Sequence, residues 1–439
     1  MSHVFPRHTK VIPPVAIKGD GIYITDSEGK QYLDGSGGAA VSCLGHSDPD
    51  VTQAIKTQVD QLAFAHTGFL SSAPAESLAD RLIAHAPEGI ERVYFVSGGS
   101  EAVESALKLA RQYMIEIGQP QRTRFISRRQ SYHGNTLGAL GTGGNEWRRE
   151  PFSPVMVSAS HISPCYEYRH RHDDETQEEY GQRAANELEA ELLRQGPENV
   201  IGFLAEPVVG ATAGAVPAVP GYFKRIREIC DQYGILLILD EVMCGMGRTG
   251  TLFACEQDGI APDMITIAKG LGAGYQPIGA MLCSGKIYEA IENGSGFFQH
   301  GHTYIGHPVA CAAADAVVRK LTDGGLTTRS AQMGEKLMEA LTAEFGQHPN
   351  IGDIRGRGMF RGLEIVEDRE TKSPFAPEKA IAAKLKKQAF ANGLICYPMG
   401  GTIDGRHGDH ILIAPPFIIT DTQIEELVDK LSTSLGQVL

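Results

Sequence analysis

Short apolar runs alternate along the middle of the chain with segments in which apolar residues recur every three or four positions. The apolar runs predict buried strands at 93–96, 124–127, 200–206, 235–240, 264–268 and 278–283. The other spacing predicts amphipathic helices at 181–193, 222–233 and 308–321. Strands that alternate with helices are typical of a mostly parallel sheet covered on both faces, so we predict an α/β fold.

Both ends of the chain have a different pattern from the middle. Near the N-terminus, two alternating segments flank Asp26-Ser27-Glu28-Gly29, which predicts a hairpin, and helices are expected from Pro49 and at 75–84. After the long helix, helical spacing at 331–345 and 377–392 is interspersed with apolar runs, which predicts a small α+β domain. The acidic stretch at 169–182 has no apolar period and predicts an exposed loop that leads into the helix expected at 181–193.

Composition narrows the class of protein. The 439 residues are 42% hydrophobic, and 40 basic against 53 acidic residues give a net charge of -13, which argues against nucleic acid or an anionic membrane as the main partner. No apolar run approaches the length of about 20 residues that a membrane span needs, and the start lacks a signal-peptide core. We therefore expect a cytoplasmic protein, while the charge leaves the partner open.

The eight cysteines contain no C-x-x-C pair and no spacing typical of a metal site. We expect reduced, structural thiols, no disulfide and no metal.

The segment 263–280 places Lys269 directly after an apolar run and within a series of glycines. Burial at a strand end disfavours the ammonium form, and a partly neutral amine can form a Schiff base with a carbonyl compound or an aldehyde cofactor. A lysine at a strand end can equally extend its ammonium to solvent, so the other residues have to decide between the two interpretations.

Two further features bear on Lys269. Ser97-Gly98-Gly99-Ser100 follows one predicted strand and opens a helix, where free backbone N–H groups could bind a phosphate or simply form a capped turn. Asp240 ends the run ILLILD with Glu241 next, as in a Walker B strand, but no G-x-x-x-x-G-K-[ST] motif accompanies it. A buried aspartate that faces a pyridinium nitrogen, together with an aldehyde on Lys269, is what pyridoxal 5'-phosphate requires of a protein.

With these residues assembled, the sequence resembles the class III aminotransferases, also called the ω-aminotransferase family, of fold-type I pyridoxal phosphate enzymes. The resemblance covers nearly the whole chain in the family's order: SGGSEAVESALKLAR, SYHGNTLGAL, AEPVVG, LLILDEVMCGMGRTG, AKGLGAGYQPIGA and HGHTYIGHPVACAAA. It implies a large cofactor-binding domain at 61–325 with a mostly parallel sheet. It also implies a small α+β domain formed by the N-terminal segment 1–60 and the C-terminal part 326–439.

The resemblance also implies roles for individual residues. Lys269 would carry the cofactor as a Schiff base, and Asp240 would pair with the pyridine nitrogen. The remaining positions that it implies around the cofactor are Gly99 and Ser100 at the phosphate, Val242 beneath the ring, Tyr132 on its other face, His133 and Gly134 in the adjoining turn, and Glu206 beside the substrate. Thr303 would reach the phosphate bound by the neighbouring subunit, which implies a homodimer or a dimer of dimers. Separately, each residue also has an ordinary structural interpretation, such as a core aromatic for Tyr132 or a helix cap for Thr303.

The predicted reaction is transfer of an amino group from an amine or ω-amino acid to a keto acid, with pyruvate as the expected acceptor, in a ping-pong cycle. Leu412 stands where relatives that use 2-oxoglutarate often carry an arginine before a Pro-Pro pair, and Arg406 in a glycine-rich loop is the candidate replacement. Arg406 could equally be a solvated loop residue. Ala40, which leaves room in the pocket, and Phe69 complete the candidate substrate residues.

Other functions remain open on the sequence alone. These are a 2-oxoglutarate aminotransferase that acts on an amino acid or a diamine, a decarboxylase or aminomutase of the same fold, and a non-catalytic regulator that binds pyridoxal phosphate. The regulator is disfavoured because no DNA-binding appendage is visible.

Overall fold

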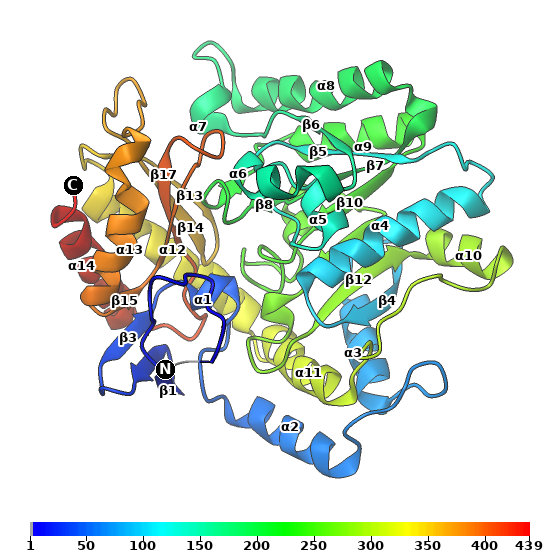
Figure 1. The fold of residues 1–439 in the computed structure, drawn as a ribbon, viewed down its shortest axis with the longest axis horizontal. Helices are drawn as coiled ribbons and strands as arrows, with labels where there is room; N and C mark the ends of the chain where they lie inside the picture. The colour runs from blue at the N-terminus through cyan, green and yellow to red at the C-terminus, as the bar shows by residue number, and fades with distance from the viewer. Residues whose placement is uncertain (1–2) are drawn as a thin grey trace.

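A seven-stranded sheet forms the centre of the larger part of the molecule in this computed structural model, which describes residues 3–439 (Figure 1). Its order is β4-β12-β11-β10-β7-β5-β6. The strands are β4 (Ile90–Val96), β5 (Arg124–Arg128), β6 (Ala159–Ile162), β7 (Val200–Ala205), β10 (Leu236–Asp240), β11 (Met264–Ile267) and β12 (Gly279–Ser284). Adjacent strands are parallel except that β12 is antiparallel to both β11 and β4. The predicted mostly parallel sheet is therefore confirmed, with β6 as a strand that the sequence pattern had not indicated.

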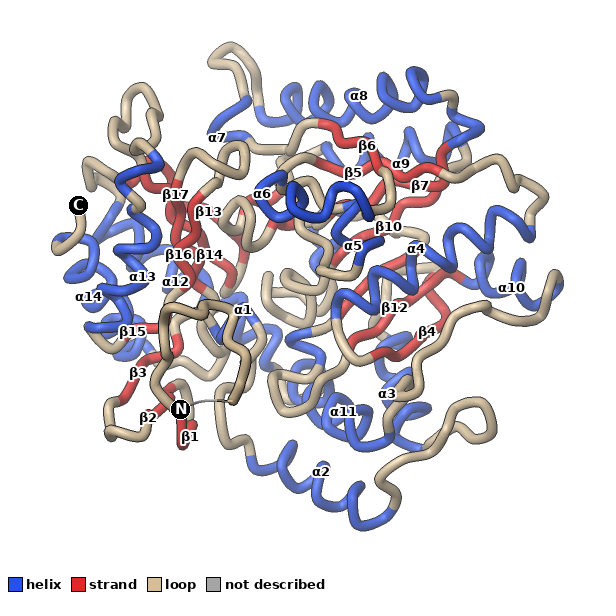
Figure 2. Tube along the Cα trace, in the orientation of Figure 1, coloured by secondary structure: helices blue, strands red, loops and turns tan. Residues whose placement is uncertain are grey.

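Helices cover both faces of this sheet (Figure 2). On one face, Leu236 and Ile238 pack in a core with α4 (Gly99–Glu116). On the other face, Leu237 and Leu239 share a core with the helices α8 (Gln177–Gln195), α9 (Tyr222–Tyr233) and α11 (Pro308–Thr322). Because successive strand residues point to opposite faces, the continuous apolar run of β10 serves both cores.

The smaller part of the molecule is built from both ends of the chain. An antiparallel sheet has the order β13-β14-β17-β16, with strands β13 (Ile351–Arg357), β14 (Phe360–Ile365), β16 (Tyr397–Gly400) and β17 (Asp409–Ile413). A second sheet has the order β1-β2-β3-β15, with strands β1 (Ala16–Asp20), β2 (Tyr23–Asp26), β3 (Gln31–Asp34) and β15 (Leu394–Ile395). The predicted hairpin is the antiparallel pair β2–β3, and β15 joins it in parallel, which ties the N-terminal segment to the C-terminal part. The domain boundaries at 60 and 325 stay a prediction.

The remaining helices complete the fold. They are α1 (Gly37–Ala40), α2 (Pro49–Gln61), α3 (Ala73–Ala84), α5 (Leu137–Thr142), α6 (Glu146–Arg149), α7 (Glu167–His170), α10 (Gly285–Asn293), α12 (Leu326–Phe345), α13 (Ile381–Ala391) and α14 (Asp421–Gly436). A short two-stranded ladder pairs β8 (Val208–Val209) with β9 (Val216–Pro217). α11 packs against α2 and α3 at one end of the large sheet.

Two local predictions are wrong. The acidic stretch is not a loop throughout, because α8 begins at Gln177, where Thr176 and Glu179 form a capping box. Acidic residues in a first turn favour a helix through its dipole, although they add no apolar period. The helix expected at 377–392 is interrupted at Ala380, whose φ of 48° is left-handed, so α13 begins only at Ile381.

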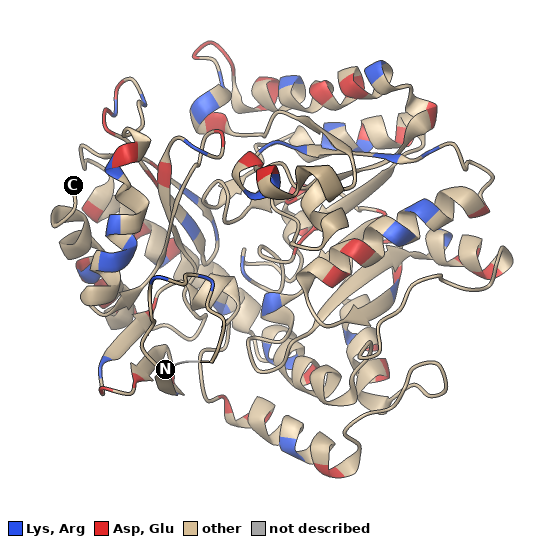
Figure 3. Cartoon of the chain, in the orientation of Figure 1, with Lys and Arg blue, Asp and Glu red and all other residues tan. Residues whose placement is uncertain are grey.

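Charged residues of both signs lie mainly on outer helices such as α8, whereas the central strands carry few (Figure 3). All eight cysteines are buried free thiols. Within residues 3–439, no helix combines the length and the apolar character needed to cross a membrane.

Candidate active site

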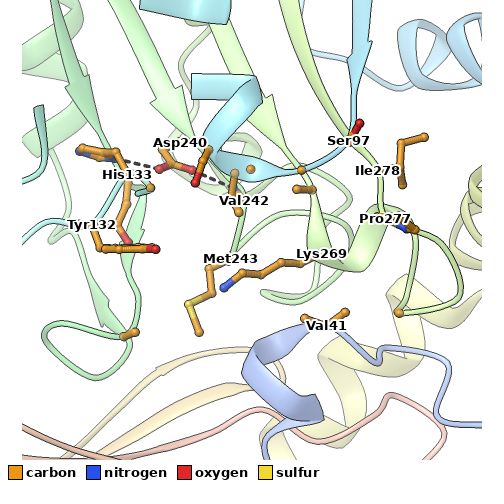
Figure 4. A pocket seen from close by; sticks show the side chains of 18 of the residues that line it. Val41, Ser97, Tyr132, His133, Asp240, Val242, Met243, Lys269, Pro277 and Ile278 are labelled. Carbon is orange, nitrogen blue, oxygen red and sulfur yellow. Dashed lines mark hydrogen bonds and ion pairs between the residues drawn. The ribbon is translucent and has the colours of Figure 1, made fainter. Parts of the chain in front are cut away.

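A cavity of about 480 Å³ opens at the carboxyl ends of the central strands (Figure 4). Asp240 is the last residue of β10, and Lys269 follows β11, which pairs with β10 in parallel. Parallel strands bring their carboxyl ends to the same edge, so these two residues line the same cavity although 29 positions separate them along the chain. The predicted site residues among the lining are Gly99, Ser100, Tyr132, His133, Gly134, Glu206, Asp240, Val242 and Lys269.

Asp240 is 3% exposed, and its carboxylate is held on both oxygens. Oδ2 lies 2.8 Å from His133 Nδ1, and Oδ1 accepts a 3.0 Å hydrogen bond from the Val242 backbone N–H. The Thr266 hydroxyl also donates to Oδ1 at 3.4 Å. A carboxylate accepts hydrogen bonds only, so His133 carries its proton on Nδ1. The buried Nε2 of His133 has no hydrogen-bond partner among the described residues.

Lys269 adopts a strained backbone conformation, with a φ of 46°, and its side chain extends toward Met243 (Figure 4). Within residues 3–439, no hydrogen bond or ion pair engages its Nζ. Burial lowers the pKa of Lys269 from 10.5 to about 8, against the opposing charges of Asp240 and Glu206. The neutral, nucleophilic fraction of the amine at neutral pH is therefore raised by roughly two orders of magnitude.

The first turn of α4 borders the same cavity with a run of small residues. A Cβ added to Gly99 would lie 2.7 Å from Cγ1 of Val242, so the backbone comes close to this wall only because residue 99 has no side chain. The Ser100 hydroxyl accepts a 3.0 Å hydrogen bond from the Asn135 backbone N–H, which joins α4 to the turn after His133. The open N-terminus of an 18-residue helix attracts anions.

Glu206 is a second buried carboxyl group in the cavity wall. Its two oxygens accept hydrogen bonds from the backbone N–H groups of Tyr132, at 3.1 Å, and Gly210, at 2.8 Å. Burial raises the pKa of Glu206, His133 opposes this, and the nearby charge of Asp240 adds to it. Glu206 thus fixes the backbone that carries Tyr132.

These groups fit the three recognisable parts of pyridoxal phosphate. The amine of Lys269 suits an aldehyde, the buried carboxylate of Asp240 suits a protonated ring nitrogen, and the start of α4 suits a phosphate. Tyr132 and Val242 supply flat and apolar surface for the ring between them.

The remaining predicted residues do not line the cavity. Ala40 is 2% exposed and packs in a small core with Ala211 and Met243, while its neighbour Val41 borders the cavity. Phe69 is 87% exposed, and Thr303 is exposed as well. The role of Phe69 at the substrate and the contact of Thr303 with a second subunit stay predictions.

Arg406 also lies outside the cavity. Its side chain is 70% exposed, and its guanidinium is 3.5 Å from a carboxylate oxygen of Glu150. The role of Arg406 as the anchor for a substrate carboxylate stays a prediction.

Arg148 is a cation beside the cavity that the sequence reasoning missed. Its guanidinium carbon lies 4.8 Å from the centre of the Tyr132 ring, and its buried Nε has no hydrogen-bond partner among the described residues. Burial raises the pKa of Tyr132, and the positive charge of Arg148 opposes this rise. Burial lowers the pKa of Lys269, and the charge of Arg148 adds to this fall. Arg148 lies in a polar stretch with a second arginine next to it, so no pattern in the sequence singles it out.

Comparisons with known proteins agree with this geometry. Residues 4–435 match the family model of aminotransferase class-III. The chain is 47% identical over 431 residues to an uncharacterized aminotransferase of Schizosaccharomyces pombe, a match that covers 98% of this chain and 93% of that protein. It is 35% identical over 434 residues to gamma aminobutyrate transaminase 3, chloroplastic, of Solanum lycopersicum, with 98% and 82% covered. A solved (S)-enantioselective omega-transaminase from Thermomicrobium roseum superimposes with a TM-score of 0.93 at 36% identity, and the match covers 100% of this chain and 96% of that one.

Proposed function

This chain belongs to the class-III aminotransferase family and is an aminotransferase of fold type I. From that membership we propose that it uses pyridoxal phosphate to move an amino group from an amine or ω-amino acid to a keto acid. Pyruvate is the expected acceptor. The donor and the acceptor react in turn at one site, in a ping-pong cycle.

One observation carries this proposal. Lys269, with a pKa lowered to about 8, and Asp240, buried and hydrogen-bonded to His133, face the same cavity at the ends of neighbouring strands. A nucleophilic amine and a fixed carboxylate that line one cavity suit the aldehyde and the ring nitrogen of a pyridine aldehyde.

When bound, pyridoxal phosphate supplies an aldehyde carbon that accepts an amino group and a ring that accepts electrons. Lys269 would hold that aldehyde in the resting enzyme and, once a donor amine has displaced it, take the proton from the donor carbon at Nζ. Asp240 would keep the ring nitrogen protonated, and the hydrogen bond from His133 orients its carboxylate for this contact. Gly99 and Ser100 would hold the phosphate at the start of α4.

Recognition of the substrate carboxylate falls to arginines on the Tyr132 side of the cavity. Arg148 is the nearer, since it lies over Tyr132 and has no carboxylate partner among the described residues, whereas Arg406 is paired with Glu150. We assign Arg148 the closer contact and Arg406 a second one that requires movement of its loop. The named relative that acts on gamma aminobutyrate, a carboxylate-bearing amine, supports a donor of this kind.

We further propose that the active unit is a homodimer in the cytoplasm. Phe69, in the segment after α2, and Tyr304, next to Thr303, are exposed apolar residues that a second subunit would bury. In such a dimer, Thr303 would complete the phosphate site of the partner, as the family resemblance implies.

The deciding experiment combines adduct mapping with product stoichiometry. Borohydride treatment of the purified yellow protein should fix the cofactor on Lys269, and peptide mapping should identify that residue. With pyruvate and a panel of amine and ω-amino acid donors, one alanine should form for each donor amine lost. An adduct on a different lysine would overturn the assignment of Lys269, and carbon dioxide release without alanine would replace transfer with decarboxylation.

A further inference from the structure

Gln130 is a buried residue two positions before Tyr132, and its conformation is unusual for its type. It is 3% exposed and has a φ of 59°, in the left-handed region that non-glycine residues seldom adopt. Such a conformation persists only where surrounding contacts determine it, and it often marks a functional position.

The Gln130 side chain binds two segments that come from different parts of the chain. Its Nε2 donates to the carbonyl oxygens of Gly401, at 2.6 Å, and Thr402, at 2.8 Å. Its Oε1 accepts a 3.1 Å hydrogen bond from Asn145 Nδ2. All the hydrogen-bonding capacity of the amide nitrogen is used on two backbone carbonyls, so the orientation of the amide group is fixed.

The first of these segments is the loop 401–408, which carries Arg406. Its base is closed by hydrogen bonds from the backbone N–H groups of Gly401 and Thr402 to the carbonyl of Gly408. Its tip rests against α6, since a Cβ on Gly405 would lie 3.3 Å from the backbone nitrogen of Trp147. The side chain of Gln130 therefore joins the base of this loop to the wall that carries Tyr132.

The second segment is α6, which carries Arg148. Asn145 caps this helix, because its Oδ1 accepts a 3.3 Å hydrogen bond from the Arg148 backbone N–H. The same side chain donates to Gln130, so the cap and Gln130 form one connected network. A four-residue helix has little stability of its own and depends on such contacts.

A parallel contact reinforces the base of the loop. The Thr402 hydroxyl lies 2.7 Å from His410 Nδ1, and His410 Nε2 lies 3.1 Å from the carbonyl of Ala211, which lines the cavity. Burial lowers the pKa of His410 to about 3, and Arg355 adds to this, so the ring is neutral at neutral pH. A carbonyl accepts only, so Nε2 donates to Ala211 and Nδ1 accepts from Thr402.

We propose that Gln130 is a positioning residue that holds α6 with Arg148 and the loop 401–408 with Arg406 in fixed places beside Tyr132, and so sets the affinity of the site for carboxylate-bearing substrates. The substrate part of this inference rests on the proposed aminotransferase function. The hydrogen bonds by which Gln130 holds α6 and the loop 401–408, here called the clamp, do not depend on that function and can be measured without catalysis.

The test compares Gln130→Met and Gln130→Glu with the wild-type holoenzyme. Methionine keeps the length of the side chain and removes the donors, whereas glutamate places carboxylate oxygens against two carbonyl oxygens. The matched control is Gln58→Glu, because Gln58 is similarly buried and donates to the carbonyl of Leu62, but lies on α2.

The first measurement is the rate of tryptic cleavage after Arg406 and after Arg148, mapped by mass spectrometry. Both Gln130 variants lose the two hydrogen bonds that Nε2 donates, and Gln130→Met also loses the bond from Asn145. These losses should raise the local opening equilibrium, and with it the cleavage rate, roughly tenfold or more in both variants and not in the control. Unchanged cleavage in Gln130→Met would overturn the clamp, whatever the enzyme catalyses.

The second measurement separates the half-reactions by stopped-flow absorbance. The KM for pyruvate should rise roughly tenfold or more in Gln130→Met, while conversion by an amine without a carboxylate and the cofactor spectrum should keep their wild-type values. Equal losses in both half-reactions, with an altered spectrum, would mean that Gln130 supports the cofactor wall through Tyr132 and would refute the specificity role. If the wild-type enzyme converts no keto acid, the proposed function fails while the cleavage result still decides the clamp.

Discussion

Replacing Lys269 with methionine should stabilise the cofactor-free protein, because the folded structure disfavours the ammonium charge that this lysine carries at neutral pH. Lowering the pKa from 10.5 to about 8 corresponds to a cost of about 3 kcal/mol for the ammonium form in the folded state. This figure already contains the favourable charges of Asp240 and Glu206, which oppose the effect of burial. Methionine removes the charge and keeps a side chain of similar size at the same strained φ.

The pH dependence has a defined sign. Below pH 8 the lysine is protonated in both the folded and the unfolded state, so the full cost applies and the gain from methionine is about 3 kcal/mol. Between pH 8 and 10.5 the unfolded state binds more protons than the folded state, so the wild-type protein recovers stability as the pH rises. At pH 9.5 the gain from methionine should fall to about 1 kcal/mol.

The assay is thermal unfolding of the cofactor-free proteins at pH 7 and pH 9.5. An unfolding entropy of about 2.1 cal/mol/K per residue converts 3 kcal/mol into a Tm increase of about 3–4 °C for a chain of 439 residues. Lys384→Met on α13 is the control, because Lys384 is exposed and its replacement should change the Tm by less than about 1 °C. An unchanged or lower Tm at pH 7, or a gain that is equal at both pH values, would refute the account of Lys269.

Three further predictions concern the cofactor, the substrate and the second subunit. Gly99→Ala should weaken cofactor affinity at least tenfold, measured by titration of the cofactor-free protein, because the added Cβ would lie 2.7 Å from Val242 Cγ1; undiminished affinity would contradict the close approach. Arg148→Ala should lower kcat/KM for pyruvate roughly ten- to a hundredfold and Arg406→Ala should lower it less, since a charge-assisted pair contributes roughly 1.5 to 3 kcal/mol. The reverse order in a stopped-flow half-reaction would return the closer contact to Arg406. Mixing an inactive Thr303→Ala protein with a variant that lacks the reactive lysine should restore part of the activity through hybrid dimers, and a fully active monomer at low concentration would exclude the shared site.

The sequence by itself determined the fold class and the candidate catalytic pair. Apolar runs long enough for buried strands, with helical spacing between them, indicate a covered parallel sheet from local pattern alone. Lys269 and Asp240 could be chosen because each follows such a run, and parallel strands end at one edge whatever the details of packing. The glycine turn at the start of α4 could also be recognised from the sequence, because a tight turn into a helix has a local signature.

Only the tertiary structure decided which residues surround this pair. Arg148 and Gln130 lie in polar segments without a period, and their importance arises from contacts with Tyr132 and with Gly401, which is 271 residues away from Gln130. Arg406 could be picked from its loop, but its distance from the cavity depends on how that loop packs on α6. Local propensity acts over a few residues, whereas such contacts join segments that are distant in the sequence. The chemistry of the side chains can therefore identify candidate residues, but only the tertiary structure shows which of them lie together at the site.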